Sequence, residues 1–88
     1  MVFNSKIYKE FYFNHLIFEG EYLNGSRNGK GKEYNTNGEL IFEGEYLNDQ
    51  KWNGKGKEYY DSGKLKFKGE YLNGKKNGKG KEYALNGN

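Results

Sequence analysis

Three near-identical blocks follow one another along this 88-residue chain, and they constrain its fold more than any other feature. The blocks span residues 16–39, 40–64 and 65–88. The middle block has one extra residue, between positions 49 and 52, where two matching stretches meet as they do at loop insertions. Residues 1–15 match the second half of a block and are predicted to form a degenerate half-repeat that caps the array with one strand. Repeats of this length bury their faces by stacking, so we expect one structural domain.

Each block contains two stretches in which apolar and polar residues alternate, the pattern of a β-strand. The first block has Leu-Ile-Phe-Glu-Gly-Glu-Tyr-Leu followed by Gly-Lys-Gly-Lys-Glu-Tyr. A polar cluster beginning at Asn24 separates these stretches, and Asn37-Gly38 is predicted to link the first block to the second as a hairpin turn. No apolar residues recur at helical spacing. The sequence therefore predicts an all-β fold, a twisted antiparallel sheet of tandem β-hairpins with about seven strands.

The composition favours a thin sheet built on aromatic side chains. Leu, Ile, Val and Phe make up only 17 residues, a level usual in disordered segments. Nine Tyr, six Phe and one Trp supply the missing apolar area, and the net charge is only +3. The absence of Cys excludes disulfides and thiolate chemistry. Because no signal peptide or long apolar run is present, we expect a cytoplasmic protein, with association to a membrane or the cytoskeleton left open.

A strand register with Gly20 opposite Gly31, and Gly31 opposite Gly44, gathers similar residues into rows on one face. The first row alternates aromatic and acidic residues: Phe18, Glu33, Phe42, Glu58, Phe67 and Glu82. The second row is glycine throughout: Gly20, Gly31, Gly44, Gly56, Gly69 and Gly80. The third row alternates Tyr22, Tyr46 and Tyr71 with further glycines. The other face receives Lys and Glu rows that are predicted to pair across strands, for example Glu45 with Lys55.

A row of glycines weakens a strand and therefore needs a physical reason. The glycines either give the aromatic rings room to lie flat and let the sheet curve, or they also leave a groove for a ligand or peptide. Aromatic residues are enriched on binding surfaces, so the second interpretation predicts a partner-binding face whose glutamates favour Lys or Arg on the partner. That face comprises Phe18, Tyr22, Glu33, Phe42, Tyr46, Glu58, Phe67, Tyr71 and Glu82.

The third block holds the chain's excess of positive charge, with six lysines against two glutamates. Lys68 stands where the other blocks have Glu19 and Glu43, and it is predicted to face Lys81 as a like charge. These lysines either bind an anionic partner or protect a sheet edge from aggregation. The candidate anion-binding residues are Lys66, Lys68, Lys75, Lys76, Lys79 and Lys81.

The sequence offers little support for catalysis or for a metal site. His15 is the only histidine, and without a second His or a Cys it is better explained as a turn residue than as a base or ligand. The stretch from Asn28 to Lys32 lacks the Lys-Ser/Thr ending of a phosphate-binding loop. We therefore expect no enzyme activity, no cofactor and no metal, and we do not expect nucleic-acid binding.

The blocks resemble the MORN (membrane occupation and recognition nexus) repeat family. The resemblance rests on Phe-Glu-Gly-Glu-Tyr at 18–22, Gly-Lys-Gly at 29–31 and the closing Asn37-Gly38, and it recurs at 42–63 and 67–87. The Lys-Glu-Tyr pattern ending at Tyr34 is closer to a variant found in bacterial and protist repeat proteins, some of them labelled antitoxins. The resemblance implies an elongated single-layer sheet of antiparallel hairpins that serves as a scaffold and is not catalytic.

Members of that family bind lipid head groups of membranes or protein partners, including helical segments laid along the glycine/aromatic face, and some self-associate. The leading hypothesis is thus an interaction module that binds a protein segment, or its own copy, on the aromatic/glycine face. Self-association through the C-terminal edge of the sheet is a further possibility. The alternatives are binding of anionic lipid head groups through the third block and antitoxin-like binding of a partner.

Overall fold

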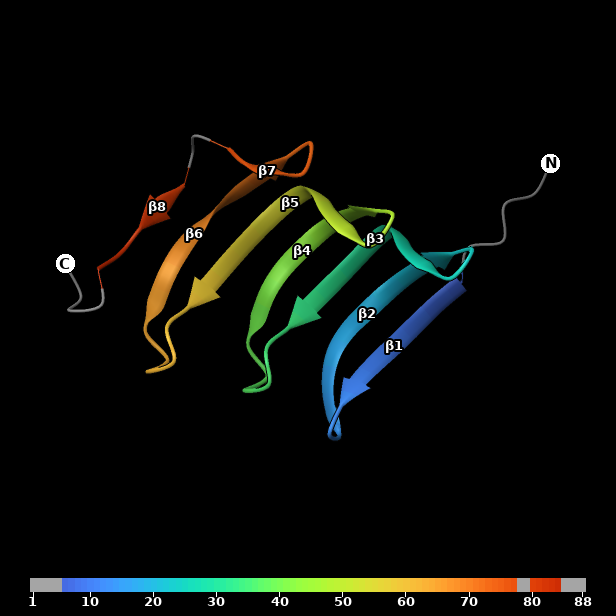
Figure 1. Ribbon diagram of the computed structural model, residues 1–88, viewed down its shortest axis with the longest axis horizontal. Coiled ribbons are helices and arrows are strands. Elements are labelled where there is room, and N and C mark those ends of the chain that lie inside the picture. Colours follow the sequence, from blue (N-terminus) through green and yellow to red (C-terminus); the bar gives the residue numbers. More distant parts are fainter. Residues whose placement is uncertain (1–5, 78–79, 85–88) are drawn as a thin grey trace.

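The computed structural model describes residues 6–77 and 80–84, and they form one open antiparallel sheet (Figure 1). The strands are β1 (Lys6–Tyr12), β2 (His15–Leu23), β3 (Ser26–Tyr34), β4 (Leu40–Leu47), β5 (Gln50–Tyr59), β6 (Leu65–Leu72), β7 (Lys75–Lys76) and β8 (Lys81–Glu82). Their order in the sheet is their order in the chain, except that β7 and β8 both pair with β6. The predicted all-β hairpin array is confirmed, and its last strand is divided into two short pieces.

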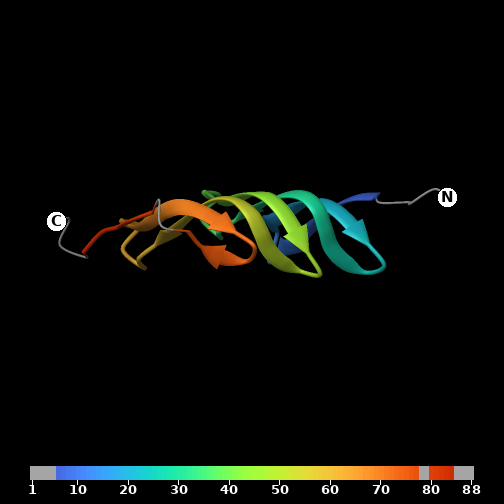
Figure 2. The same ribbon diagram turned by 90° about the horizontal axis from the view of Figure 1, so that it is seen from above.

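The sheet is a single thin layer measuring 52 × 33 × 12 Å. Figure 2 shows this layer from above, with the strands curving and coiling along their length. Every long strand pairing contains an irregularity of register. Because bulges bend strands and increase their twist, these irregularities account for the curvature.

Two-residue turns close the hairpins within the blocks. Asn24 and Gly25 have φ of 53° and 83°, and Asn73 and Gly74 have φ of 52° and 84°. Two successive left-handed residues are the type I′ geometry that suits strand twist. Asn37-Gly38 lies in the hairpin connection between β3 and β4, as predicted, but it does not form a two-residue turn. Residues 35–39 form a longer loop, in which the Asn35 side chain accepts hydrogen bonds from the backbone N–H groups of Asn37 (3.1 Å) and Glu39 (3.0 Å).

The predicted register holds between β3 and β4 and at the start of the β2–β3 pairing. It is wrong at Tyr22, which faces Arg27 instead of Gly29, and between β4 and β5. Gly20 faces Gly31 and Gly31 faces Gly44, as expected. Gly44 then faces Gly54 instead of Gly56. The extra residue of the middle block explains the difference. If Gly56 faced Gly44, β5 would have to accommodate three unpaired residues between Gln50 and Gly56. The observed pairing of Gly54 with Gly44 leaves only one. A slip of two residues leaves every side chain on its predicted face.

The core of this thin sheet is aromatic. Phe18 and Phe42 are fully buried, and Tyr46 and Phe67 are almost so. The Phe18 and Tyr46 rings meet edge to face, with centroids 5.2 Å apart. A Cβ placed on Gly31 would lie 2.7 Å from the Phe18 ring, closer than real Cβ atoms come to a neighbour. The glycines therefore provide the room that the rings occupy, which is the first of the two interpretations of the glycine row.

Candidate interaction faces of the sheet

One face of the sheet, here called the aromatic face, carries the buried Phe rings together with a cation from each block. The Arg27 guanidinium lies 4.2 Å from the centre of the Phe18 ring, and Lys76 Nζ lies 4.3 Å from that of Phe67. Lys51 lies 5.6 Å from the Phe42 ring in the same way. Cations over aromatic faces are attracted by the ring quadrupole.

The position of these three cations over the rings was not predicted from the sequence, and Lys76 was expected only as an anion-binding residue. The predicted register put Gly29 opposite Tyr22, whereas the irregular pairing of β2 with β3 brings Arg27 opposite Tyr22. A signal was nevertheless available, because a basic residue follows each core Phe by nine positions.

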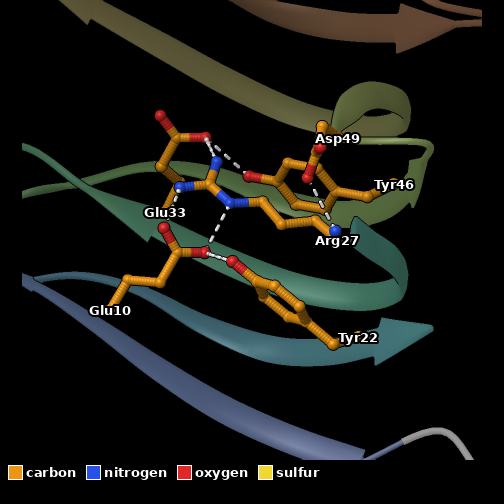
Figure 3. Close-up of polar contacts among 6 residues, drawn as sticks. All are labelled: Glu10, Tyr22, Arg27, Glu33, Tyr46 and Asp49. Atoms are coloured by element: carbon orange, nitrogen blue, oxygen red, sulfur yellow. Dashed lines mark hydrogen bonds and ion pairs between the residues drawn. The ribbon is translucent and has the colours of Figure 1, made fainter. Parts of the chain in front are cut away.

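Arg27 is the centre of a polar network that joins four strands (Figure 3). Its Nε and Nη2 donate to the two carboxylate oxygens of Glu10 on β1, at 2.9 and 3.0 Å. Its Nη1 donates to Glu33 at 3.2 Å. The hydroxyl of Tyr46 donates to the same Glu33 oxygen at 2.7 Å, and that of Tyr22 donates to Glu10. Bidentate arginine–carboxylate contacts are stronger than single hydrogen bonds, and they also fix the relative orientation of the two groups.

The ionisation of this network follows from its contacts. The hydrogen bonds from Arg27 hold the pKa of Glu10 below its ordinary value, although partial burial acts in the opposite direction. Burial, together with the hydrogen bond to Glu33, raises the pKa of Tyr46. At neutral pH Glu10 is therefore ionised and Tyr46 protonated, so the Arg27 guanidinium donates to a carboxylate and the Tyr46 hydroxyl keeps the proton that it donates.

The same arrangement recurs with weaker contacts towards β6. Lys76 donates to Glu58 at 3.3 Å, and the Tyr71 hydroxyl lies 3.5 Å from that carboxylate. Lys51 lies beside the Phe42 and Tyr71 rings, and within the described ranges no carboxylate is within 4 Å of its amine. From Phe18 to Phe67 the aromatic face is thus filled by its own side chains. A hollow of about 440 Å³ opens at its N-terminal end, between Tyr8 and Tyr22.

The predicted partner-binding residues all come together on this face, but at different depths. Phe18, Phe42, Tyr46 and Phe67 are buried, so a partner on this face would meet the residues around them. Tyr22, Tyr71, Glu33 and Glu58 are half-buried, and Glu82 on β8 is exposed. Glu33 and Glu58 already accept hydrogen bonds from cations of the chain itself.

The other face, here called the charged face, carries a row of alternating charge across six strands. Each residue of the row faces the next across the sheet: Lys9, Glu19, Lys32, Glu43, Lys55 and Glu70. Two contacts in it are long ion pairs, Lys9–Glu19 at 3.9 Å and Lys32–Glu43 at 3.8 Å. The prediction that Lys55 pairs with Glu45 is wrong, because the slip between β4 and β5 brings Lys55 opposite Glu43.

Three lysines face one another without an acidic residue between them, and the slip moves Glu43 away from the first of them, Lys57. Lys57 faces Lys68, and Lys68 faces Lys81; these three residues are called the lysine ladder below. Across residues 6–77 and 80–84, none of their amines has an ion pair. The ladder lines a hollow of about 440 Å³, together with Leu40, Ile41 and Tyr83. The hollow therefore combines positive charge with apolar surface.

The family model for the MORN repeat matches residues 18–39, 42–64 and 67–88. This chain belongs to the MORN repeat family. Each match begins at a core Phe of the aromatic face, so the repeat unit of the family coincides with the packing unit of the sheet. No curated protein and no solved structure matches the chain. MORN repeats are in general non-catalytic modules that mediate interactions with proteins or membranes.

The MORN array separates the six lysines that were predicted to bind anions. Lys68 and Lys81 face each other on the charged face. Lys76 instead lies on the aromatic face with Glu58, and Lys66 lies 5.7 Å from the Tyr60 ring. Lys75 is exposed on β7, and Lys79 falls outside the described residues. Lys57 was not among the candidates, although the predicted register already placed it opposite Lys68.

In the part of the chain that the structure describes, no three His, Cys, Asp or Glu residues are grouped so that they could hold a metal ion. His15 is exposed at the start of β2, opposite Tyr12. No helix that could cross a membrane occurs among the described residues.

Proposed function

We propose that this chain is a non-catalytic interaction module that holds a protein segment across its strands on the charged face. One observation carries this proposal: the aromatic face is filled between Phe18 and Phe67, whereas the charged face is hollowed in two places. One hollow contains the lysine ladder. The other, of about 610 Å³, lies over β1 to β4, beside Ile7, Lys32 and Glu45.

The free-energy cost of binding a partner also favours the charged face over the aromatic face. A partner on the aromatic face would have to displace Arg27, whose donors already match the Glu10 and Glu33 carboxylates. Leaving partly buried charged groups without partners is costly. Side chains on the charged face, such as Lys57 and Lys68, are exposed and can contact a partner without breaking an internal contact. Their backbone is already hydrogen-bonded in the sheet, which reduces the ordering that binding requires.

The proposal is tested by photo-crosslinking in the source cells. A photoreactive residue replaces Lys68 on the charged face or, as the matched control, Lys51 on the aromatic face of the neighbouring strand β5. We expect protein adducts from position 68 and few from position 51. Adducts from position 51 alone, or from neither position, would contradict the proposal.

A second candidate function, self-association through β1, is favoured by the apolar side chains that this strand exposes. Ile7 is 65% exposed and Phe11 is 61% exposed. An apolar strand edge is a template for pairing with another strand. The solution mass of the chain tests this candidate. A dimer that Ile7→Lys and Phe11→Lys convert to a monomer would support it, and a monomeric wild type at high concentration would exclude it.

A further inference from the structure

We infer that the lysine ladder recognises an acidic protein segment that also carries apolar residues. The inference rests on the proposed function, that the charged face holds a protein segment, and adds the chemistry of that segment. Three observations carry it: the unfavourable charge pattern of the ladder, its geometry, and the acidic residues that border its hollow.

The like charges of the ladder destabilise the strand pairs that carry them. Like charges directly opposite one another destabilise a strand pair. The first two blocks avoid the problem with Glu19 and Glu43, which face lysines, whereas the third block has Lys68 at the same position. Lys57 and Lys81 then flank it with the same sign. A bound carboxylate chain would relieve this repulsion, so the charge that is unfavourable for the free sheet favours its complex with an acidic ligand.

The geometry fits a polypeptide that lies across the strands. Neighbouring strands lie about 4.8 Å apart, so the three lysine stems form a line at that spacing. Carboxylates one turn apart on a helix are separated by about 5–6 Å, a difference that flexible lysine side chains absorb. Leu40 and Ile41 lie beside the ladder in the same hollow and are half-exposed. The matching segment therefore has acidic residues along one line and apolar residues along the adjacent line.

The border of the hollow favours a narrow ligand over a broad anionic surface. Glu43 and Glu70 line the same hollow as the ladder. A membrane or a nucleic acid that covered the face would bring its phosphates against these carboxylates as well as against the lysines. A single acidic segment can follow the ladder and leave both glutamates in water.

Binding of a defined peptide to the whole chain tests the inference. The probe is a synthetic amphipathic peptide with Glu at every fourth position and Leu along the neighbouring line, and its partner control has Lys in place of every Glu. Fluorescence anisotropy at low salt gives the affinities. We expect the acidic peptide to bind, the basic peptide not to bind, and the affinity to fall as salt rises.

Two triple variants with the same change in net charge assign the binding to the ladder. One combines Lys57→Gln, Lys68→Gln and Lys81→Gln. The matched control combines Lys6→Gln, Lys64→Gln and Lys75→Gln, three exposed lysines outside the ladder. We expect the ladder variant to bind the acidic peptide about tenfold or more weakly, as the loss of three surface ion pairs implies. The control should remain within about twofold of the wild type, since it retains the ladder. Equal losses in both variants would overturn the inference.

Charge reversal and two other probes complete the test. A variant that combines Lys57→Glu, Lys68→Glu and Lys81→Glu should exchange its preference and bind the basic peptide. Vesicles of phosphatidylserine and phosphatidylcholine, and a single-stranded oligonucleotide, are the competing anions. Ladder-dependent binding of either one, without binding of the acidic peptide, would overturn the inference. If crosslinking at position 68 persists while the peptide result fails, the proposed function stands and only the partner chemistry is wrong.

Discussion

The two faces of this sheet are made from the same strands and the same alternating sequence, yet they differ in how their charges are satisfied. On the aromatic face Arg27 lies over a buried ring between two carboxylates. On the charged face the ladder lysines face only one another. A one-layer sheet must bury its core on one face, and here the polar groups of that face contact one another. The groups left for a partner lie on the other face.

The largest effect is expected from removing a core ring on the aromatic face. Phe18→Ala should cost about 3–5 kcal/mol of unfolding free energy, because it deletes a fully buried ring. Ile17→Ala, one residue earlier and on the charged face, should cost about 1 kcal/mol since its side chain is only half-buried. Urea denaturation measures both. Similar losses of unfolding free energy in the two variants would contradict the claim that the core lies on the aromatic face alone.

A glycine beneath the rings should be nearly as sensitive. Gly31→Ala places a methyl group 2.7 Å from the Phe18 ring and 3.1 Å from that of Tyr46, and overpacking of this kind costs about 1–3 kcal/mol. Lys32→Ala, on the next residue and the opposite face, should change stability by less than about 0.5 kcal/mol. If Gly31→Ala is as mild as Lys32→Ala, glycine is not needed to seat the rings.

The Arg27 network on the aromatic face predicts a stability that depends on pH. Because Arg27 lowers the pKa of Glu10 in the folded state, this carboxylate stabilises the fold above its unfolded pKa of about 4.3 and loses that effect as pH falls through the lower folded value. Glu10→Gln should therefore be less stable than the wild type at pH 7, and the gap should close in acid. The control is Glu45→Gln on the charged face, a change of the same kind outside the Arg27 network, and thermal unfolding over the same pH range measures both variants. A gap for Glu10→Gln that stays constant down to pH 2 would contradict the assignment.

The smallest effect is expected on the charged face, and it has the opposite sign. Lys68→Glu should stabilise the chain by about 0.5 kcal/mol, because it places an acid between Lys57 and Lys81. Lys75→Glu, exposed on β7, provides the matched change in charge and should have little effect on the melting temperature. A loss of stability in Lys68→Glu would show that the ladder is not repulsive.

Much of the fold was predictable, because alternation with period two and the threefold repeat leave few arrangements open. The aromatic and glycine residues of one face, and the opposition of Gly20 with Gly31, follow from that pattern. The slip at Gly44 does not, because it depends on how many residues a bulge in β5 can absorb, which neighbouring blocks do not reveal. The predicted register already placed Lys57 opposite Lys68, and the slip adds that Glu43 faces Lys55 instead of Lys57.

The role of the cations was hidden for a related reason. Arg27 belongs to a stretch that looks like a turn in the sequence, yet it lies within β3 and returns over Phe18, nine residues earlier. Contacts of this kind depend on the direction of a side chain in a bent strand. A register inferred from regular, unbulged strands does not predict that direction. The family resemblance predicted the scaffold, and the confirmed MORN repeats give the same scaffold without naming a partner.

The most direct test of the account follows the side chains of both faces while the acidic peptide is added. In NMR spectra with labelled lysine and tyrosine side chains, the signals of Lys57, Lys68 and Lys81 should shift as the peptide binds. Those of the Tyr22, Tyr46 and Tyr71 rings should stay in place, since the aromatic face is already filled. Shifts of the tyrosine rings without shifts of the ladder lysines would contradict the central claim that the partner binds the charged face.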